Sequence, residues 1–272
     1  MKLWNHDAPL ALAMLQPAPL PGSYRHAGAS IDDIAAQLLQ EAHDAATCGF
    51  DGFLLQNMND MPIKQFSRPE AIAYMTRIGL MLRQAYPEHV LGILVNWDGV
   101  AALSIADAIG ADFVRVEHLY TGAEITSAGL LQAQCCEICE LRKRIGSTIP
   151  VYADIYECHG VPLGAKAMGD AAWEAVHEAF ADGLFISGKT TAQSIDILNE
   201  IRARVNVPVF LGGGANGANV RELLMHFDGV SVATWIKNGD MKNPIDINRG
   251  RQFMDEVAAA RTDLASMTTS VV

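Results

Sequence analysis

The sequence predicts a single (β/α)8 barrel, the TIM-barrel class of α/β fold. Short apolar runs recur along the 272 residues, and each is followed by a longer stretch with helical periodicity. Most runs are apolar throughout, as expected for strands of a parallel sheet that is buried on both faces. Eight such units in strict alternation favour a closed barrel over its rival, a doubly wound open sheet with extra strands.

The strands are expected where the apolar runs fall, and the helices between them. The first helix, over 30–49, begins with the capping pair Ser30 and Asp33 and ends at Gly49. A later stretch, LLQAQCCEICELRKR, also has a helical pattern. We expect one barrel domain over residues 1–265 and a frayed tail over 266–272. The predicted strands are LALAMLQ (10–16), DGFLLQN (51–57), VLGILVN (90–96), DFVRVEH (112–118), PVYADIY (150–156), DGLFISG (182–188), VPVFLGG (207–213) and DGVSVAT (228–234).

Composition excludes several classes of protein. Half of the residues are apolar and 19% are charged, which is typical of a soluble globular chain. A net charge of −11 argues against nucleic-acid binding, which needs a basic face. No apolar stretch approaches the length of about 18 residues that membrane insertion requires. Five cysteines, an odd number, indicate the reducing cytoplasm rather than a secreted disulfide framework.

Polar residues collect at the predicted carboxyl ends of the strands, where barrels of this class carry their functional groups. Their convergence from separate strands is the main reason to predict an enzyme. We expect substrate-binding roles for Gln16, Gln56, Asn57, Asn96 and Arg115. Trp97, beside them, would either stack on a sugar or base or pack in the core.

Two neighbouring loops carry bare backbone, as a phosphate-binding site requires. Glycines let several N–H donors approach an anion, and a following helix N-terminus adds a positive dipole. The loop after 207–213 continues to a helix expected near Gly217, and Lys237 in the next loop is either a further cation or a surface lysine. The alternative is that the glycines serve only tight packing. The predicted phosphate-binding residues are Ser187, Gly188, Gly213, Gly214, Ala233 and Thr234.

Asp154 and His159 are the first candidates for acid-base catalysis. A histidine titrates near neutral pH, and a carboxylate at the barrel mouth is tuned by its neighbours. The alternatives are a salt bridge from Asp154 to Arg115 and a structural hydrogen bond for His159. Glu117 and Asp98 are further catalytic candidates. Scattered carboxylates would also suit Mg²⁺, although no residue spacing identifies a metal site.

Several motifs together resemble the BtpA/SgcQ family, barrels similar to the ribulose-phosphate-binding enzymes. They include APLPGS (18–23), DGFLLQNMNDMP (51–62), ADIYECHGVPL (153–163), PVFLGGGANGANV (208–220) and the stretch 228–254. Asp154 and His159 keep the family's Asp and His. The sequence departs from the family pattern where Gln16 replaces a His and Gln56-Asn57 replaces Glu-Asn. It departs again where Asn96-Trp97-Asp98 replaces Arg-Asn-Asp. The resemblance with these departures implies a substrate that differs from the family's common one.

The sequence thus predicts an enzyme of isomerase, epimerase or lyase type acting on a phosphorylated sugar or nucleotide-like small molecule. One branch of the family is named for photosystem I biogenesis, so a non-catalytic assembly or binding factor is the alternative from another class. A glycosidic-bond hydrolase is a third reading, which needs two carboxylates flanking one sugar carbon. Barrels of this class often form oligomers, and the sequence is compatible with a homo-oligomer.

Overall fold

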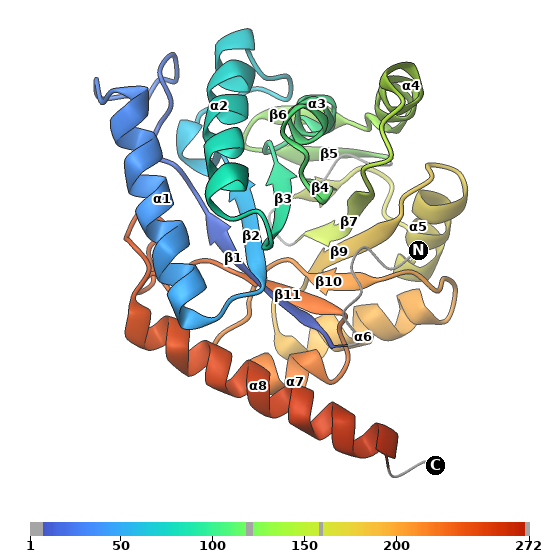
Figure 1. Ribbon diagram of the computed structural model, residues 1–272. Helices are drawn as coiled ribbons and strands as arrows, with labels where there is room; N and C mark the ends of the chain where they lie inside the picture. Colours follow the sequence, from blue (N-terminus) through green and yellow to red (C-terminus); the bar gives the residue numbers. More distant parts are fainter. Residues whose placement is uncertain (1–7, 118–121, 158–159, 270–272) are drawn as a thin grey trace.

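A computed structural model describes residues 8–117, 122–157 and 160–269 (Figure 1). Eight parallel strands close into one barrel in the order β1-β11-β10-β9-β7-β4-β3-β2, which confirms the predicted fold class. Each strand lies within its predicted apolar run or extends one residue beyond it. The strands are β1 (Leu10–Leu15), β2 (Gly52–Gln56), β3 (Val90–Leu94), β4 (Phe113–Val116), β7 (Val151–Glu157), β9 (Gly183–Ser187), β10 (Val209–Leu211) and β11 (Gly229–Val232).

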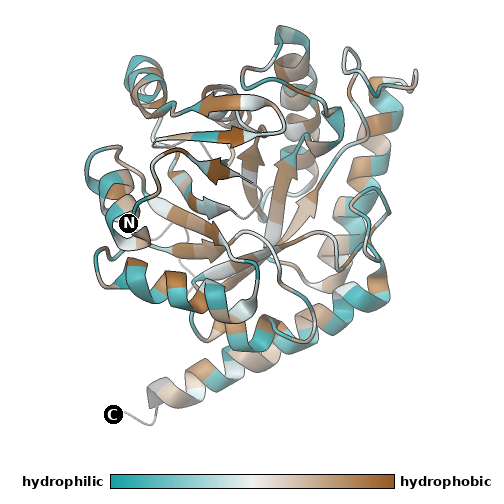
Figure 2. Ribbon diagram, turned by 180° about the vertical axis from the view of Figure 1, so that it is seen from behind, coloured by the Kyte–Doolittle hydropathy of each residue, from teal (hydrophilic) through white to brown (hydrophobic). Residues whose placement is uncertain are grey.

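Helices surround the barrel, with their apolar faces on the strands (Figure 2). The first helix is capped as predicted: the Ser30 side chain accepts a hydrogen bond from the Asp33 N–H, and Gly49 is left-handed, with φ of 93°. No described helix has the length and apolarity to cross a membrane. The helices are α1 (Ile31–Cys48), α2 (Pro69–Ala85), α3 (Gly99–Ile109), α4 (Cys135–Ile145), α5 (Met168–His177), α6 (Thr191–Arg202), α7 (Val220–Leu224) and α8 (Ile247–Thr269), with a 3-10 turn η1 (Met58–Asp60).

The structure differs from the sequence-based expectation at three places. The helix after β10 begins at Val220 rather than near Gly217. The last helix runs to Thr269 and so enters the segment predicted to be a frayed tail. The stretch predicted to be helical from residue 130 starts as a strand, and α4 begins only at Cys135.

That strand belongs to a small antiparallel sheet that no pattern predicted. It consists of β5 (Ala123–Thr126), β6 (Gly129–Gln132) and β8 (Val161–Pro162), in the order β6-β5-β8. The three strands are contributed by the segments that follow β4 and β7, so the sheet lies beside the barrel mouth (Figure 1). Thr126 and Ser127, in the β5–β6 hairpin, form part of the wall of the cavity described below.

Aromatic rings fill the barrel interior beneath the mouth. Phe113, Tyr152, Phe185 and Phe210 come from four successive strands, and their neighbouring ring centroids lie 5.3–6.3 Å apart. Glycines on adjacent strands make room for them: a Cβ at Gly229 would lie 2.2 Å from the Phe210 ring. This aromatic layer closes the barrel interior below the predicted site residues, and the Arg115 guanidinium packs directly on the Phe185 ring.

Replacing Phe210 by Ala tests this layer. Phe210→Ala should lower the free energy of unfolding by about 3–5 kcal/mol, because the lost ring leaves a cavity between rigid strands. Chemical denaturation measures the change. Phe66→Ala is the matched control, since Phe66 is 66% exposed and its loss should cost less than about 0.5 kcal/mol. Equal costs for the two variants would contradict a close-packed barrel interior.

Candidate functional site

A cavity of about 730 Å³ opens at the carboxyl ends of the strands. Its position agrees with the rule that barrels of this class carry their sites at this face. The carboxyl end of β9 and the loops after β1, β2, β3, β4, β10 and β11 all contribute to its wall. The cavity brings together ten of the residues predicted from the sequence: Gln16, Gln56, Asn96, Arg115, Glu117, Ser187, Gly213, Gly214, Ala233 and Thr234.

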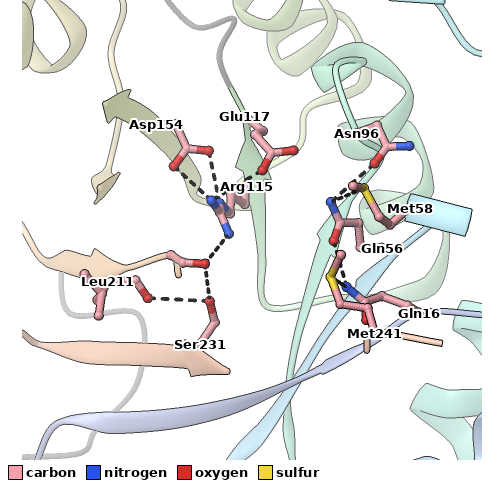
Figure 3. A network of polar contacts seen from close by, with 11 residues as sticks. Gln16, Gln56, Met58, Asn96, Arg115, Glu117, Asp154, Leu211, Ser231 and Met241 are labelled. Carbon is pink, nitrogen blue, oxygen red and sulfur yellow. Dashed lines mark hydrogen bonds and ion pairs between the residues drawn. The ribbon is translucent and has the colours of Figure 1, made fainter. Parts of the chain in front are cut away.

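Arg115 is the centre of the charged half of the site (Figure 3). Its Nε and Nη2 bind the two oxygens of Asp154 at 3.1 and 3.2 Å. Nη2 also lies 3.6 Å from an oxygen of Glu117. Nη1 donates to the Gly212 carbonyl at 3.3 Å, and the guanidinium lies 4.6 Å above the Phe185 ring. One buried cation therefore joins β4, β7, β9 and the loop after β10.

The two carboxylates beside Arg115 are not equivalent. The Asp154 side chain is 1% exposed and is held by both ends of the guanidinium, which is the salt bridge that the sequence left open as an alternative. The Glu117 side chain is 17% exposed, and it is the one carboxylate among the described residues that line the cavity. A ligand can reach Glu117 directly. His159, the other member of the predicted pair, lies outside the described residues.

Asp98 and Asn57 support the mouth of the barrel without lining the cavity. Asp98 caps α3: one oxygen accepts from the Ala101 N–H at 3.0 Å, and the other accepts from the Ser67 N–H at 2.6 Å. Asn57 donates to Asp60 at 3.2 Å. Because both Asp98 oxygens accept from backbone N–H groups, its contacts are those of a helix-capping carboxylate, and its predicted catalytic role stays a prediction.

The glycine loop after β10 presents bare backbone to the cavity. Within the described part of the chain, the N–H groups of Gly213, Gly214 and Ala215 donate to no protein acceptor. Gly214 has φ of 86°, a conformation that favours glycine. Ala233 and Thr234, after β11, face the same space. Gly188 instead lines an adjoining cavity of about 340 Å³, which shares Gly213 and Gly214 with the main one.

Arg249 adds a cation to this wall that the sequence analysis missed. It stands in the first turn of α8 and lines the cavity. Its Nη1 donates to the Trp235 carbonyl at 3.0 Å, and its guanidinium lies 5.3 Å from the centre of the Trp235 ring. The sequence signal that could have identified Arg249 is its position: it is a basic residue in the first turn of the helix that follows the last barrel strand.

Lys237 is not a surface lysine, one of the two roles that the sequence left open, and it does not line the cavity. Its side chain is fully buried, and its Nζ binds Glu41 of α1 at 2.7 Å and the Met241 carbonyl at 3.4 Å. Burial raises the pKa of Glu41, and the Lys237 ammonium opposes that rise. The pair ties the loop after β11 to α1 and so positions Met241, which lines the cavity.

The opposite half of the cavity carries side-chain amides. Gln16 donates to Gln56, and Gln56 donates to Asn96, each at 3.3 Å (Figure 3). No charged group belongs to this row. Among the residues that the structure describes, no group of three or more His, Cys, Asp or Glu side chains is placed to hold a metal ion, so the Mg²⁺ suggested by the carboxylates has no such cluster there.

The fold and the site define a (β/α)8 barrel with a cavity at the carboxyl ends of its strands. The profile of the BtpA family matches residues 7–259, and the chain belongs to that family. It is 34% identical over 248 residues to an uncharacterized protein of Methanocaldococcus jannaschii, covering 90% of this chain and 93% of that one. It is 32% identical to the photosystem I biogenesis protein BtpA of Synechocystis, covering 93% of this chain and 89% of that one.

Solved structures support the fold. A crystal structure of 3-hexulose-6-phosphate synthase is similar to this barrel with a TM-score of 0.57 and 14% identity, covering 91% of this chain and 99% of that one. At that identity the likeness concerns the fold alone. The family and the barrel class predicted from the sequence are therefore both confirmed.

The structural role of Lys237 is testable. Lys237→Met should lower the free energy of unfolding by about 3 kcal/mol, because Glu41 is left partly buried without its partner. The double variant Glu41→Gln/Lys237→Met should recover part of that loss. Thermal and chemical denaturation measure both. A stable Lys237→Met protein that only loses ligand binding would instead place the lysine in the site.

Proposed function

We propose that the protein is an enzyme that binds a phosphorylated sugar or nucleotide-like small molecule and moves a proton on it. The observation that carries the proposal is the wall formed by Gly213, Gly214 and Ala215. These residues line the same cavity as Glu117, and their N–H groups lack protein acceptors in the described chain. Such a backbone cradle suits the oxygens of a phosphate.

Charge on this wall supports the phosphate assignment. Arg249 lines the same cavity as the glycine loop, and Thr234 and Ser187 add hydroxyl groups. A charge-assisted hydrogen bond from a guanidinium to a phosphate is roughly twice as strong as a neutral one. The site can therefore attract an anion although the whole chain carries a net charge of −11.

Glu117 supplies the acid-base group. Its carboxylate reaches the cavity, and Arg115 beside it offers positive charge where an oxyanion develops on a neighbouring carbonyl. Isomerases, epimerases and many lyases begin by moving a proton next to a carbonyl, so this pair serves all three. Asp154 is then a positioning residue that holds Arg115 in place.

A specific observation favours a second candidate, the assembly factor. Ile125 pairs with both Leu130 and Val161 across the β6-β5-β8 sheet, and all three side chains are exposed. Directly paired residues share one face, so the sheet presents an apolar surface beside the barrel mouth. The hydrolase alternative has less support, because it needs two carboxylates and Glu117 is the one described carboxylate on the cavity.

A thermal-shift experiment tests the phosphate site. Sugar phosphates and nucleotides should each raise the melting temperature more than their unphosphorylated parents do. A ligand at 100 times its dissociation constant adds about 2.7 kcal/mol, which corresponds to several degrees for a chain of this length. Gly213→Asp should abolish the shift, because its carboxylate repels the phosphate.

Gly213→Ala is the matched control. A Cβ there meets its nearest atom, Ser187 Oγ, at 3.5 Å, so the small uncharged side chain fits. It should keep most of the shift. If Gly213→Asp melts normally and still responds to every phosphorylated compound as the unmodified protein does, the phosphate site lies elsewhere.

Proton transfer by Glu117 is tested in deuterated water. With the sugar phosphate that binds best, the protein should exchange a carbon-bound hydrogen next to the carbonyl, as followed by NMR. Glu117→Gln should slow that exchange by about 10²–10⁴-fold. Glu140→Gln, on the exposed face of α4, should leave the rate unchanged. Exchange that survives in Glu117→Gln would assign the base to another residue.

A further inference from the structure

The side-chain amides of Gln16, Gln56 and Asn96 form a row in which every hydrogen bond runs in the same direction. Gln16 Nε2 donates to Gln56 Oε1, Gln56 Nε2 donates to Asn96 Oδ1, and Asn96 Nδ2 donates to the Asn57 carbonyl at 3.2 Å. All three amides are buried and lie on the cavity wall. Figure 3 shows the row on the opposite side of the view from Arg115.

The remaining hydrogen-bonding groups of the row have poor partners. The Gln16 Nε2 group also faces the Met241 sulfur at 3.3 Å, and the Gln56 Nε2 group faces the Met58 sulfur at 4.0 Å. A thioether is a weak acceptor. Among the described atoms, Gln16 Oε1 has no hydrogen-bond partner at all. Buried amides normally find full partners, so this row is incomplete without a ligand.

The surroundings of the row indicate what kind of group completes it. Met14, Met58, Met61 and Met241 line the cavity together with Trp97, and their faces are apolar and uncharged. Methionine side chains are flexible, so they can turn aside for an entering group and then pack against its faces. A flat, neutral ring whose edge carries carbonyl oxygens and an N–H group matches both the amides and the thioethers.

The size of the cavity agrees with a ring-bearing ligand. Sites for drug-sized molecules usually measure about 300–1,000 Å³. The volume of about 730 Å³ therefore leaves room beside a sugar phosphate for a further ring. Gly213 and Gly214 are on the β10 side of the cavity, whereas the row comes from the ends of β1, β2 and β3.

We propose that the amide row binds a neutral, carbonyl-bearing ring, so that the ligand is a nucleoside monophosphate or a similar ring phosphate rather than a simple sugar phosphate. This inference rests on the proposed function for its phosphate end. The row supplies N–H donors to the ring's carbonyl oxygens and, through Gln16 Oε1, an acceptor for its N–H. The thioethers and Trp97 pack against the ring.

Calorimetric titration with ring and ringless probes tests the proposal. The better bound of UMP and IMP should bind at least tenfold more tightly than ribose 5-phosphate. Gln56→Met removes the central amide at nearly constant size and should weaken binding of the nucleotide about tenfold, as expected for loss of one or two neutral hydrogen bonds. Binding of ribose 5-phosphate should change by less than about twofold.

Two further variants keep the experiment decisive. Gln16→Met should repeat the nucleotide-specific loss if Gln56→Met fails to fold, as judged by its melting curve. Gln40→Met is the matched control, because Gln40 is an exposed glutamine on α1 whose amide binds Asp44. It should leave both affinities unchanged.

The possible failures are distinguishable. If the amide variants weaken nucleotide and ribose 5-phosphate equally, or weaken neither, the ring subsite is wrong. Folded, unmodified protein that binds none of UMP, IMP, uridine and inosine also overturns it. If uridine or inosine binding depends on Gln56 while Gly213→Asp leaves nucleotide binding intact, the ring subsite stands and the proposed phosphate site fails.

Discussion

The buried ion pair between Arg115 and Asp154 is the constraint on which the rest of the site depends. A buried guanidinium must be paired, because an unpaired charge in this environment is strongly destabilising. Arg115 meets that need with Asp154, Glu117 and the Gly212 carbonyl. A Cβ at Gly212 would lie 2.5 Å from Arg115 Nη2, so the first glycine of the loop makes room for the cation. The glycines that follow are then free to face the cavity.

This arrangement separates three tasks around one cavity. Arg115 and Glu117 form a charged side where a proton can move, the loop after β10 forms a backbone side, and the amides of β1, β2 and β3 form a neutral side. Under the proposed function, the anionic end of the ligand binds at the loop after β10, and its ring binds at the amides from the ends of β1, β2 and β3. Binding energy from these non-reacting parts of the ligand can be used to orient the reacting carbon.

The sequence predicted the elements that rest on local pattern and missed those that rest on distant partners. The barrel strands were predicted because they are short and apolar throughout. The β6-β5-β8 sheet was missed because its strands are short and mix polar with apolar residues. Lys237 was misplaced because its partner Glu41 is 196 positions away in the chain. Asp98 likewise looked catalytic at a strand end, and its role as a helix cap appears only in the folded geometry.

Two of the departures from the family pattern, Gln16 and Gln56, are hydrogen-bonded to each other in the structure. The resemblance places a histidine at the position of Gln16 and a glutamate at that of Gln56. A histidine N–H donating to a glutamate oxygen has the same polarity as the observed bond from Gln16 Nε2 to Gln56 Oε1. The replacement therefore keeps the direction of the hydrogen bond while removing two titratable groups, of which the histidine exchanges protons near neutral pH. Under the proposed function, this side of the cavity recognises a neutral group, and proton transfer is left to the side that holds Glu117.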